Sequence, residues 1–179
     1  MRNIEQKFQI ADKRGLLNFL SADSRIRFVF RRVQEDVYFN RKNGRLKMRL
    51  VPGETAQLIF YRRPDLTAAR MSEYSLTPVD NPPEKIAELA EKYGERGRVS
   101  KLRELYLFRN VRIHLDEVAG LGGFLELESV VGPDADEPTA RQNLNLMLDL
   151  LKPFLGSAIP VSYVDLIMTR NEKGSEYDR

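Results

Sequence analysis

Three carboxylates in the second half of the chain are spaced so that they can meet. Asp116 lies near the end of one alternating apolar–polar run, and Glu126 and Glu128 lie in the next run, after a glycine-rich stretch. Successive side chains of a β-strand point to opposite faces, so the three carboxylates share one face if the two runs pair as a hairpin. Carboxylates that are only solvated need not lie close together. Carboxylates that bind Mg²⁺ or Mn²⁺ must, because these hard cations prefer several oxygen ligands. The spacing therefore predicts a divalent-metal site.

The hairpin that would position these carboxylates spans residues 111–131. Apolar and polar side chains alternate along both arms, and the glycines within residues 120–123 favour a turn between them. His114 lies two residues before Asp116 and on the same face, where it can contact an anion or act as an acid near neutral pH. A histidine that is only hydrogen-bonded in place, with no chemical role, fits that position equally well.

Basic side chains recur on the polar faces of the other predicted strands. For one strand, a solvent-exposed face is the ordinary explanation. Recurrence over the whole chain instead favours an α+β fold: a closed, roughly eight-stranded antiparallel β-barrel with a charged lumen and helices packed outside. Buried charges need partners or a charged ligand, and an excess of cations beside carboxylates suits a triphosphate that arrives with its metal. The basic positions are Lys7, Lys47, Arg49, Arg62, Lys101, Arg103 and Arg112, with Glu5 and Glu73 beside them.

Periodicity and turn residues predict the remaining elements. Strands are expected at residues 3–10, 26–30, 34–40, 45–50, 57–63, 71–76 and 99–108, and a closing strand or turn at residues 161–168. Helices are expected after Asp12, from Asn81, and within residues 134–156, where a leucine stripe fits either the core or a dimer face. We expect a single domain over residues 1–170 and a disordered tail over residues 171–179.

Composition excludes several classes of site and partner. The chain has 179 residues, no cysteine and one histidine, which rules out disulfides, thiolate zinc sites, thiol catalysis and a multi-histidine metal site. A net charge of +3 is far from the electrostatic footprint of a nucleic-acid-binding protein. The chain shows neither an apolar run of membrane-spanning length nor a hydrophobic signal at its start, so we expect a cytoplasmic protein without membrane contact.

Several motifs, in their order along the chain, resemble those of the CYTH superfamily of triphosphate tunnel metalloenzymes. This superfamily includes class IV adenylyl cyclases, thiamine triphosphatases and inorganic triphosphatases. The family's Glu-x-Glu-x-Lys motif corresponds to residues 3–7, with Asn3 in place of the first glutamate. Arg62 stands where the family has lysine. Residues 46–49, 61–64, 101–103 and 113–128 match further motifs, and residues 34–39 and 162–166 are more similar to the class IV cyclase branch.

The resemblance implies roles for individual residues. It implies Mg²⁺ or Mn²⁺ at Glu5, Asp116, Glu126 and Glu128, and catalysis by Glu5, Lys7 and Arg49. It implies a triphosphate held by Lys7, Lys47, Arg49, Arg62, Lys101 and Arg103, to which the charged face adds Arg112 and His114. Asn3 removes a negative charge and cannot act as a base, which bears on the metal site and on catalysis.

Three functions fit these residues. The first is a class IV adenylyl cyclase, which converts ATP to cyclic AMP and pyrophosphate. The second is a triphosphatase that hydrolyses inorganic triphosphate, thiamine triphosphate or a nucleoside triphosphate. The third is a non-catalytic binder of polyphosphate or nucleotide. Asn3 suggests this function, because the cations are kept while one acidic residue of the motif is missing. In each case the expected partner is a small molecule that contains triphosphate, and a homodimer is left open.

Overall fold

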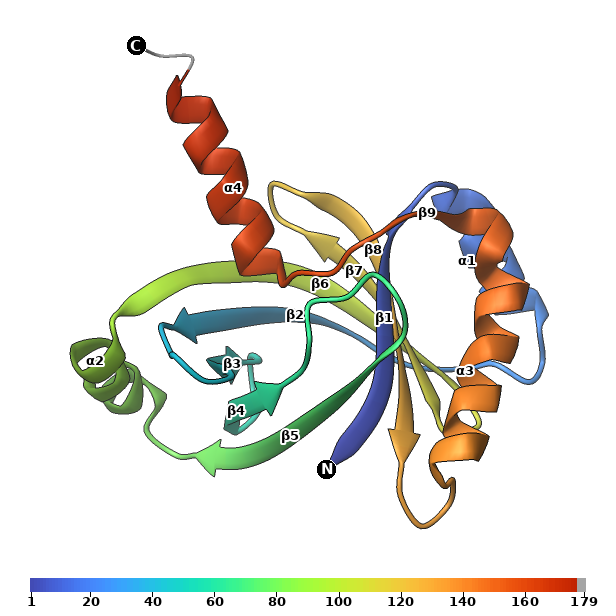
Figure 1. Ribbon diagram of the computed structural model, residues 1–179, viewed down its shortest axis with the longest axis horizontal. Helices are drawn as coiled ribbons and strands as arrows, with labels where there is room; N and C mark the ends of the chain where they lie inside the picture. The colour runs from blue at the N-terminus through green and yellow to red at the C-terminus, as the bar shows by residue number, and fades with distance from the viewer. Residues whose placement is uncertain (177–179) are drawn as a thin grey trace.

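Antiparallel strands form a ring at the centre of this computed structural model, which describes the backbone of residues 1–176 and the side chains of residues 1–171 (Figure 1). Within residues 1–176, eight strands are hydrogen-bonded in the order β5-β4-β3-β2-β6-β7-β8-β1, and β1 also pairs with β5. These strands are β1 (Arg2–Ile10), β2 (Arg27–Phe39), β3 (Arg45–Leu50), β4 (Ala56–Arg62), β5 (Arg70–Val79), β6 (Glu95–Phe108), β7 (Val111–Val118) and β8 (Gly122–Val131).

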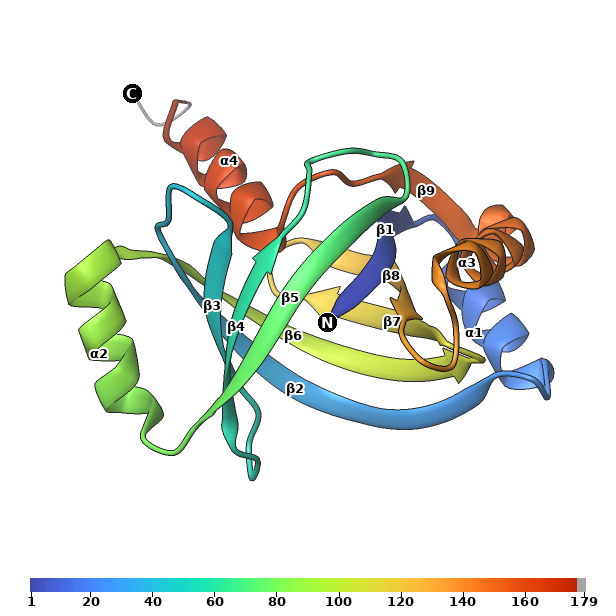
Figure 2. The same cartoon turned by 60° about the horizontal axis from the view of Figure 1, so that its bottom comes forward.

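The ring is joined unevenly around its circumference. β2 and β6 pair along nearly their whole length, whereas β1 and β5 pair only through residues 2–5 and 70–73. Figure 2 shows β5 crossing the ring in front of β2 and β6. The predicted α+β class and antiparallel sheet are confirmed, and the predicted closed barrel is confirmed as far as a ring of strands.

Tight turns connect the strands that carry the charged residues. Arg109, with a φ of 52°, turns β6 into β7, and Gly120 and Gly122, with φ of 75° and 91°, turn β7 into β8. Glycine adopts such positive φ values without a steric penalty. The β7–β8 register pairs His114 with Glu126 and Arg112 with Glu128. The predicted hairpin over residues 111–131 is therefore present, with its polar side chains on one face.

Helices lie outside the ring. In the described residues they are α1 (Lys13–Ala22), α2 (Pro82–Tyr93), α3 (Glu137–Leu151) and α4 (Tyr163–Glu176), and a short 3-10 turn (Lys152–Phe154) leads from α3 into strand β9 (Leu155–Ala158), which pairs with β1. The side chains of Asp12 and Asp136 accept hydrogen bonds from the first turns of α1 and α3, which is ordinary N-terminal capping. None of these helices has the length and apolar character needed to cross a membrane.

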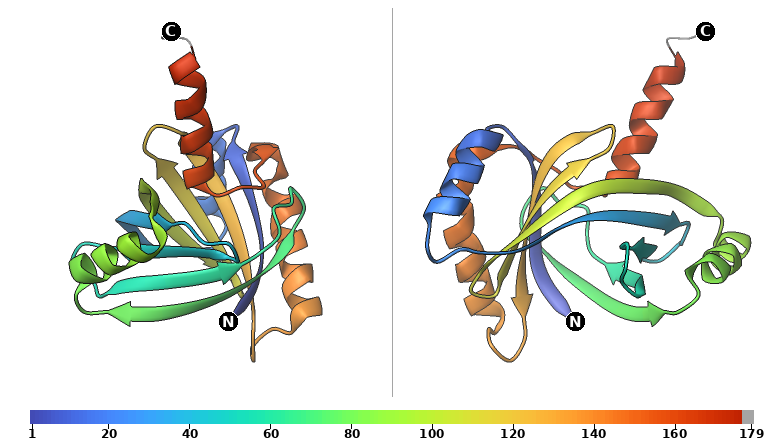
Figure 3. Two further views of the ribbon diagram at one scale, coloured as in Figure 1. Left: turned by 60° about the vertical axis from the view of Figure 1, so that its left-hand side comes forward. Right: turned by 180° about the vertical axis from the view of Figure 1, so that it is seen from behind.

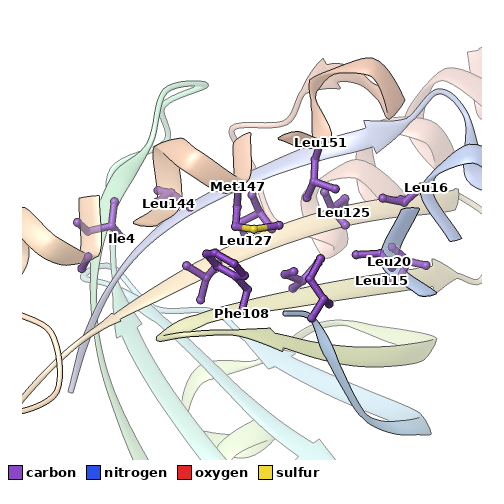
Figure 4. Packing of buried hydrophobic residues seen from close by; sticks show 14 residues of the cluster. Ile4, Leu16, Leu20, Phe108, Leu115, Leu125, Leu127, Leu144, Met147 and Leu151 are labelled. Atoms are coloured by element: carbon purple, nitrogen blue, oxygen red, sulfur yellow. The ribbon is translucent and has the colours of Figure 1, made fainter. Parts of the chain in front are cut away.

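The outward strand faces are apolar and form the core with the helices. α1 and α3 lie side by side against β1, β7 and β8 (Figure 3). Leu144, Met147 and Leu151 of α3 are fully buried there against Leu125 and Leu127 of β8 (Figure 4). α2 covers the outer face of β2–β4, and the start of α4 packs on β6–β8. The leucine stripe of α3 is thus core, and these contacts leave the polar strand faces to the inside of the ring.

Three elements differ from the sequence-based predictions. The two strands expected at residues 26–30 and 34–40 form one strand, β2, because Arg31 and Arg32 pair regularly with Glu104 and Arg103 of β6. Residues 161–168, expected as a closing strand or turn, instead lead into α4, which begins at Tyr163. The Ser162 N–H and hydroxyl donate to Asp165 in the first turn of α4, and Val164 is buried on the ring. α4 runs to Glu176, into the segment expected as a tail, and residues 177–179 lie outside the described part.

Candidate functional site

A cavity of about 350 Å³ lies inside the ring, and every one of the eight strands contributes side chains to its wall. Ser162 and Tyr163, at the start of α4, line it as well. The alternation of the strands turns their polar faces toward this cavity. Nearly all of the sequence-predicted site residues line it: Glu5, Lys7, Lys47, Arg49, Lys101, Arg103, Arg112, His114, Glu126 and Glu128.

Asp36 of β2 organises three of the cations. Its Oδ2 accepts from Lys47 Nζ at 2.9 Å and from Lys101 Nζ at 3.0 Å, and Arg49 donates to both carboxylate oxygens at 2.8 and 3.0 Å. Asp36 is fully buried. Lys47, Arg49 and Lys101, here called the cation cluster, thus outnumber their shared anion by two charges when both lysines are protonated. The excess favours a polyanionic ligand.

The charges around the cation cluster shift the pKa values of its members. Burial and the neighbouring Arg49 lower the pKa of Lys47 to about 7. Burial and Arg103 lower the pKa of Lys101 to about 8. For Asp36, burial alone would raise the pKa, but Arg49, Lys101 and Lys47 together hold it well below its usual range. Asp36 therefore stays ionised, whereas the two lysines titrate near neutral pH.

Arg103 and Asp116 form a second buried pair. They face each other in the β6–β7 register, and Arg103 donates to both oxygens of Asp116 at 2.6 and 2.5 Å. Arg103 also donates to Glu126 at 3.1 Å, and the Tyr163 hydroxyl donates to Asp116 at 2.8 Å. Both oxygens of Asp116 are thereby occupied. The sequence analysis placed Asp116 among the metal ligands, and this stays a prediction; in the structure Asp116 accepts hydrogen bonds from Arg103 and Tyr163.

His114, Glu126 and Glu128 form the group that can hold a metal ion. One donor atom from each lies within 4.8 Å of the others, and His114 Nδ1 is 3.6 Å from Glu128 and 3.9 Å from Glu126. His114 Nδ1 is buried and has no hydrogen-bond partner, so its lone pair or proton is uncompensated. The two carboxylates suit Mg²⁺ or Mn²⁺, whereas the imidazole is a ligand that transition metals prefer. The residues present fit a divalent cation, and Asp116 is not part of this three-residue group.

Glu5 adjoins this group but is held by arginines. It pairs with Glu128 in the β1–β8 register, and its Oε1 lies 3.0 Å from Arg63 and 3.5 Å from Arg70. Burial, with Glu126 as the next cause, raises the pKa of Glu5 to about 7. Three carboxylates that repel one another inside a cavity are relieved when a cation binds among them.

Lys7 lies between α4 and the group formed by His114, Glu126 and Glu128. Its ammonium lies 3.2 Å from Glu126 and 4.0 Å from the centre of the Tyr163 ring. Burial alone would raise the pKa of Glu126, but Lys7, His114 and Arg103 hold it well below the usual range. Arg112 lines the same cavity, 3.7 Å from Glu128 and 3.4 Å from the Tyr74 hydroxyl.

Arg62 is the predicted site residue that the structure places outside. It is exposed and lies against Phe60, 5.3 Å from the ring centre. Leu58 and Phe60 of β4 pack toward α2, so the alternate positions Ile59, Tyr61 and Arg63 face the cavity. The side chain of Arg63 is 3% exposed and contacts Glu5. Strand alternation that starts from the outward-facing Leu58 and Phe60 would have predicted Arg63, and not Arg62, as the inward-facing residue.

Sequence reasoning also missed two residues that organise the site. Asp36 shares a strand face with Gln34 and Tyr38, which both line the cavity, but its role depends on contacts across two strand pairings. Tyr163 packs on Phe124 and also donates to Asp116. Asn3 lines the cavity, is 3% exposed, and its Oδ1 has no hydrogen-bond partner.

Comparison with known proteins identifies the family. The CYTH domain model matches residues 1–163, so the chain belongs to the CYTH family, as its motifs predicted. A protein of Methanocaldococcus jannaschii that carries the name "Putative adenylate cyclase" is 24% identical over 173 residues, which covers 93% of this chain and 98% of that protein. The CYTH family includes adenylate cyclases and triphosphatases and is metal-dependent.

Solved structures share the fold. A conserved hypothetical protein of Pyrococcus furiosus has a TM-score of 0.75 and 22% identity, with coverage of 92% of this chain and 99% of that chain. The S. pombe RNA triphosphatase Pct1, solved in complex with the Spt5 CTD, has a TM-score of 0.50 and 15% identity, with coverage of 90% and 87%. Identities this low show a common ring of strands and carry no statement about substrate.

Proposed function

We propose that this chain is a metal-dependent enzyme that acts on a triphosphate bound inside the ring, with a reaction of the class IV adenylyl cyclase type. One observation carries the proposal. The cation cluster and the group His114, Glu126 and Glu128 line one cavity, so cationic phosphate-binding groups and metal-binding groups face the same space. Phosphoryl chemistry needs mainly positioning and neutralisation of negative charge, which this combination supplies.

The cationic side chains bind and orient the phosphates in this proposal. Asp36 holds Lys47, Arg49 and Lys101 in place before the ligand arrives, so little reorganisation is needed on binding. Arg103 is fixed in the same way by Asp116. His114, Glu126 and Glu128 are the residues that would hold Mg²⁺ or Mn²⁺, which when bound neutralises phosphate charge.

The cyclase reaction exchanges one bond to phosphorus for another. The 3′-oxygen of the ribose bonds to the α-phosphorus, the bond from that phosphorus to the bridging oxygen breaks, and pyrophosphate leaves while the hydroxyl proton passes to solvent. The cyclase name of the Methanocaldococcus relative and the cyclase-like segments at residues 34–39 and 162–166 support this choice.

Hydrolysis of the triphosphate is the alternative. The same cations and carboxylates serve a reaction in which water attacks the terminal phosphoryl group. The CYTH family, to which the chain belongs, includes triphosphatases as well as adenylate cyclases, and this membership is the observation that favours the alternative.

Product analysis tests the proposal. Purified protein is incubated separately with ATP and with inorganic triphosphate, each with Mg²⁺ and with Mn²⁺, and the products are resolved by chromatography. We expect cyclic AMP and pyrophosphate from ATP. ADP or pyrophosphate together with orthophosphate would instead establish a triphosphatase. Binding by calorimetry without any turnover would leave a non-catalytic binder, and an absence of both binding and turnover would overturn the proposal.

A further inference from the structure

A second cavity lies at one end of the ring and has a volume of about 510 Å³. The turn between β2 and β3, the start of β6 and the first turns of α4 contribute to its wall. Tyr38, Arg63 and Ser162 line both this cavity and the one inside the ring, so the two cavities share a boundary. The proposed function gives the second cavity no role.

Arginines dominate the charge of the second cavity. In the part of the chain that the structure describes, its charged lining residues are Arg41, Arg45, Arg63 and Arg96, with the acids Asp65 and Asp165. Four positive charges against two negative charges leave an excess of two, which favours an anionic ligand. The four arginines are here called the arginine mouth.

Two of these arginines are held in place and keep donors for a ligand. Arg45 uses one nitrogen, Nη2, for both oxygens of Asp65, at 2.6 and 2.7 Å, and Arg96 uses its Nη2 for Asp165 at 2.8 Å. A guanidinium has five N–H donors in a planar fork that matches phosphate oxygens. The side chains of Arg45 and Arg96 are 22% and 39% exposed, so an anion can reach them.

A row of cations on β3 connects the two cavities. Arg45, Lys47 and Arg49 occupy alternate positions and therefore share one strand face. Lys47 and Arg49 line the inner cavity, and Arg45 lines the second one. The Tyr61 ring lies between them, 5.8 Å from Lys47 Nζ and 5.9 Å from Arg45 Cζ. A phosphate ion that leaves the cation cluster along β3 meets Arg45 next.

The opposite end of the inner cavity is less suited to an anion. β2 and β6 pair Phe30 with Leu105 there, and both side chains line the cavity. Arg112, on the neighbouring strand β7, lies 3.7 Å from Glu128, which offsets its charge. The excess of cationic side chains beyond the cation cluster thus lies at the end where α4 begins.

We propose that the arginine mouth is a second anion site, which binds inorganic pyrophosphate after it leaves the cation cluster and before it reaches solvent. The identity of the anion rests on the proposed function, because pyrophosphate is the phosphate product of that reaction. The proposal goes beyond that function by assigning a cavity outside the ring and the end of the ring by which the product leaves.

The number of bound pyrophosphate ions tests the proposal. Purified protein is dialysed to equilibrium against radiolabelled inorganic pyrophosphate in EDTA, so that no metal ion links the anion to carboxylates. We expect two pyrophosphate ions per chain, one at the cation cluster and one at the arginine mouth. Arg49→Ala should weaken the first site and Arg96→Ala the second, and each should leave the other site unchanged.

Arg98→Ala is the matched control for Arg96→Ala. Arg98 lies two residues further along β6, pairs with Glu35 and Glu95, and does not line the second cavity. Arg96 is partly exposed, so its replacement does not endanger folding, and the loss of a charged hydrogen bond should weaken the second site several-fold. Arg98→Ala should alter neither site.

A further variant should strengthen the second site. Asp65 lines the cavity and accepts from Arg45, so Asp65→Asn raises the net positive charge there and releases donors of Arg45. We expect pyrophosphate to bind several-fold more tightly at this site, a gain that damage to the fold does not produce. Glu137→Gln is the control, because Glu137 is similarly exposed, also pairs with an arginine and lies on α3, away from the cavity.

The outcomes distinguish the inference from the function on which it rests. A single pyrophosphate ion per wild-type chain would overturn the inference and leave the proposed function standing. Weakening of the same site by Arg49→Ala and Arg96→Ala, or an equal effect of Arg96→Ala and Arg98→Ala, would also overturn it. Failure of the wild-type protein to bind either pyrophosphate or inorganic triphosphate would overturn the proposed function itself.

Discussion

Lys47 and Lys101 extend from strands on either side of β2 and reach the same oxygen, Asp36 Oδ2, at 2.9 and 3.0 Å. Arg49 occupies the other oxygen at 2.8 Å. One buried carboxylate thus holds three cations that would otherwise repel one another. The arrangement keeps the cations in the wall of the cavity when no anion is bound, and it leaves them an excess charge for one.

Loss of the Asp36 charge should destabilise the protein in a way that a ligand can reverse. Asp36→Asn leaves three cavity-lining cations without their anion, and we expect the free energy of unfolding to fall by about 3 kcal/mol. Denaturant unfolding with and without inorganic triphosphate measures the effect, and added triphosphate should restore part of the loss. Glu35→Gln is the control, because Glu35 pairs with Arg98 at the surface and should change stability by less than about 1 kcal/mol. Equal stability of the two variants would contradict the role given to Asp36.

Arg49 and Arg62 should differ sharply in triphosphate binding. Arg49 lines the cavity, whereas Arg62 is exposed outside it. A charged hydrogen bond contributes about 1.5–3 kcal/mol, so Arg49→Ala should weaken triphosphate binding roughly tenfold to a hundredfold. Arg62→Ala should leave the dissociation constant unchanged in the same calorimetric titration. A larger effect at Arg62 than at Arg49 would mean that triphosphate binds elsewhere.

Metal affinity should depend on His114 and Glu128 and not on Asp116. Replacing a ligand should cost at least as much as replacing one of its hydrogen-bond partners, which is about tenfold or more. We therefore expect His114→Gln and Glu128→Gln to weaken Mn²⁺ binding by that factor, as measured by the loss of the free-ion electron paramagnetic resonance signal. Asp116→Asn should keep Mn²⁺ affinity close to the wild-type value. The reverse pattern would return Asp116 to the metal site that the sequence predicted.

Triphosphate affinity should fall as the pH rises through neutrality. The pKa values of Lys47 and Lys101 lie at about 7 and about 8 in the free protein, and a bound polyanion raises both. Well below pH 7 both lysines are protonated already, so binding is at full strength. Above these values the free protein has lost protons that the complex retains, so affinity decreases by up to about tenfold per pH unit for each proton taken up.

Comparison of wild type with Lys47→Arg isolates this pH effect. Arginine stays protonated throughout, and ionisation of the ligand affects both proteins alike. The ratio of their dissociation constants for triphosphate, measured in EDTA from pH 6 to pH 9, should therefore change with pH. A constant ratio would show that Lys47 does not titrate in this range.

Asn3→Glu should strengthen metal binding. Asn3 lines the cavity two residues from Glu5 on the same face of β1, and its Oδ1 has no hydrogen-bond partner. A carboxylate there adds a negative charge beside a group that attracts a divalent cation. We expect Mn²⁺ affinity to rise several-fold by the same resonance measurement, whereas Asn3→Gln should not raise it. No gain with Asn3→Glu would place residue 3 outside the metal environment.

Much of the site follows from local sequence. Strand alternation, with its period of two, was enough to place Lys7, Lys101, Glu126 and Glu128 on inward faces, because the apolar alternate positions had to pack against helices. The hairpin at residues 111–131 followed from its glycines and its two alternating arms. The CYTH assignment followed from short motifs that occur along the chain in the same order as in the family. The family match over residues 1–163 confirms it.

Strand phase and cross-strand partners were decided only by the tertiary structure. Arg62 and Arg63 are adjacent, and which of them faces the cavity depends on the packing of Phe60 against α2. Asp116 has the sequence pattern of a metal ligand, but Arg103 lies opposite it on β6 and takes both of its oxygens. A strand's own sequence specifies which of its side chains point inward. The partner of each inward charge is set by the register of neighbouring strands around the ring, as the pairing of Asp116 with Arg103 shows.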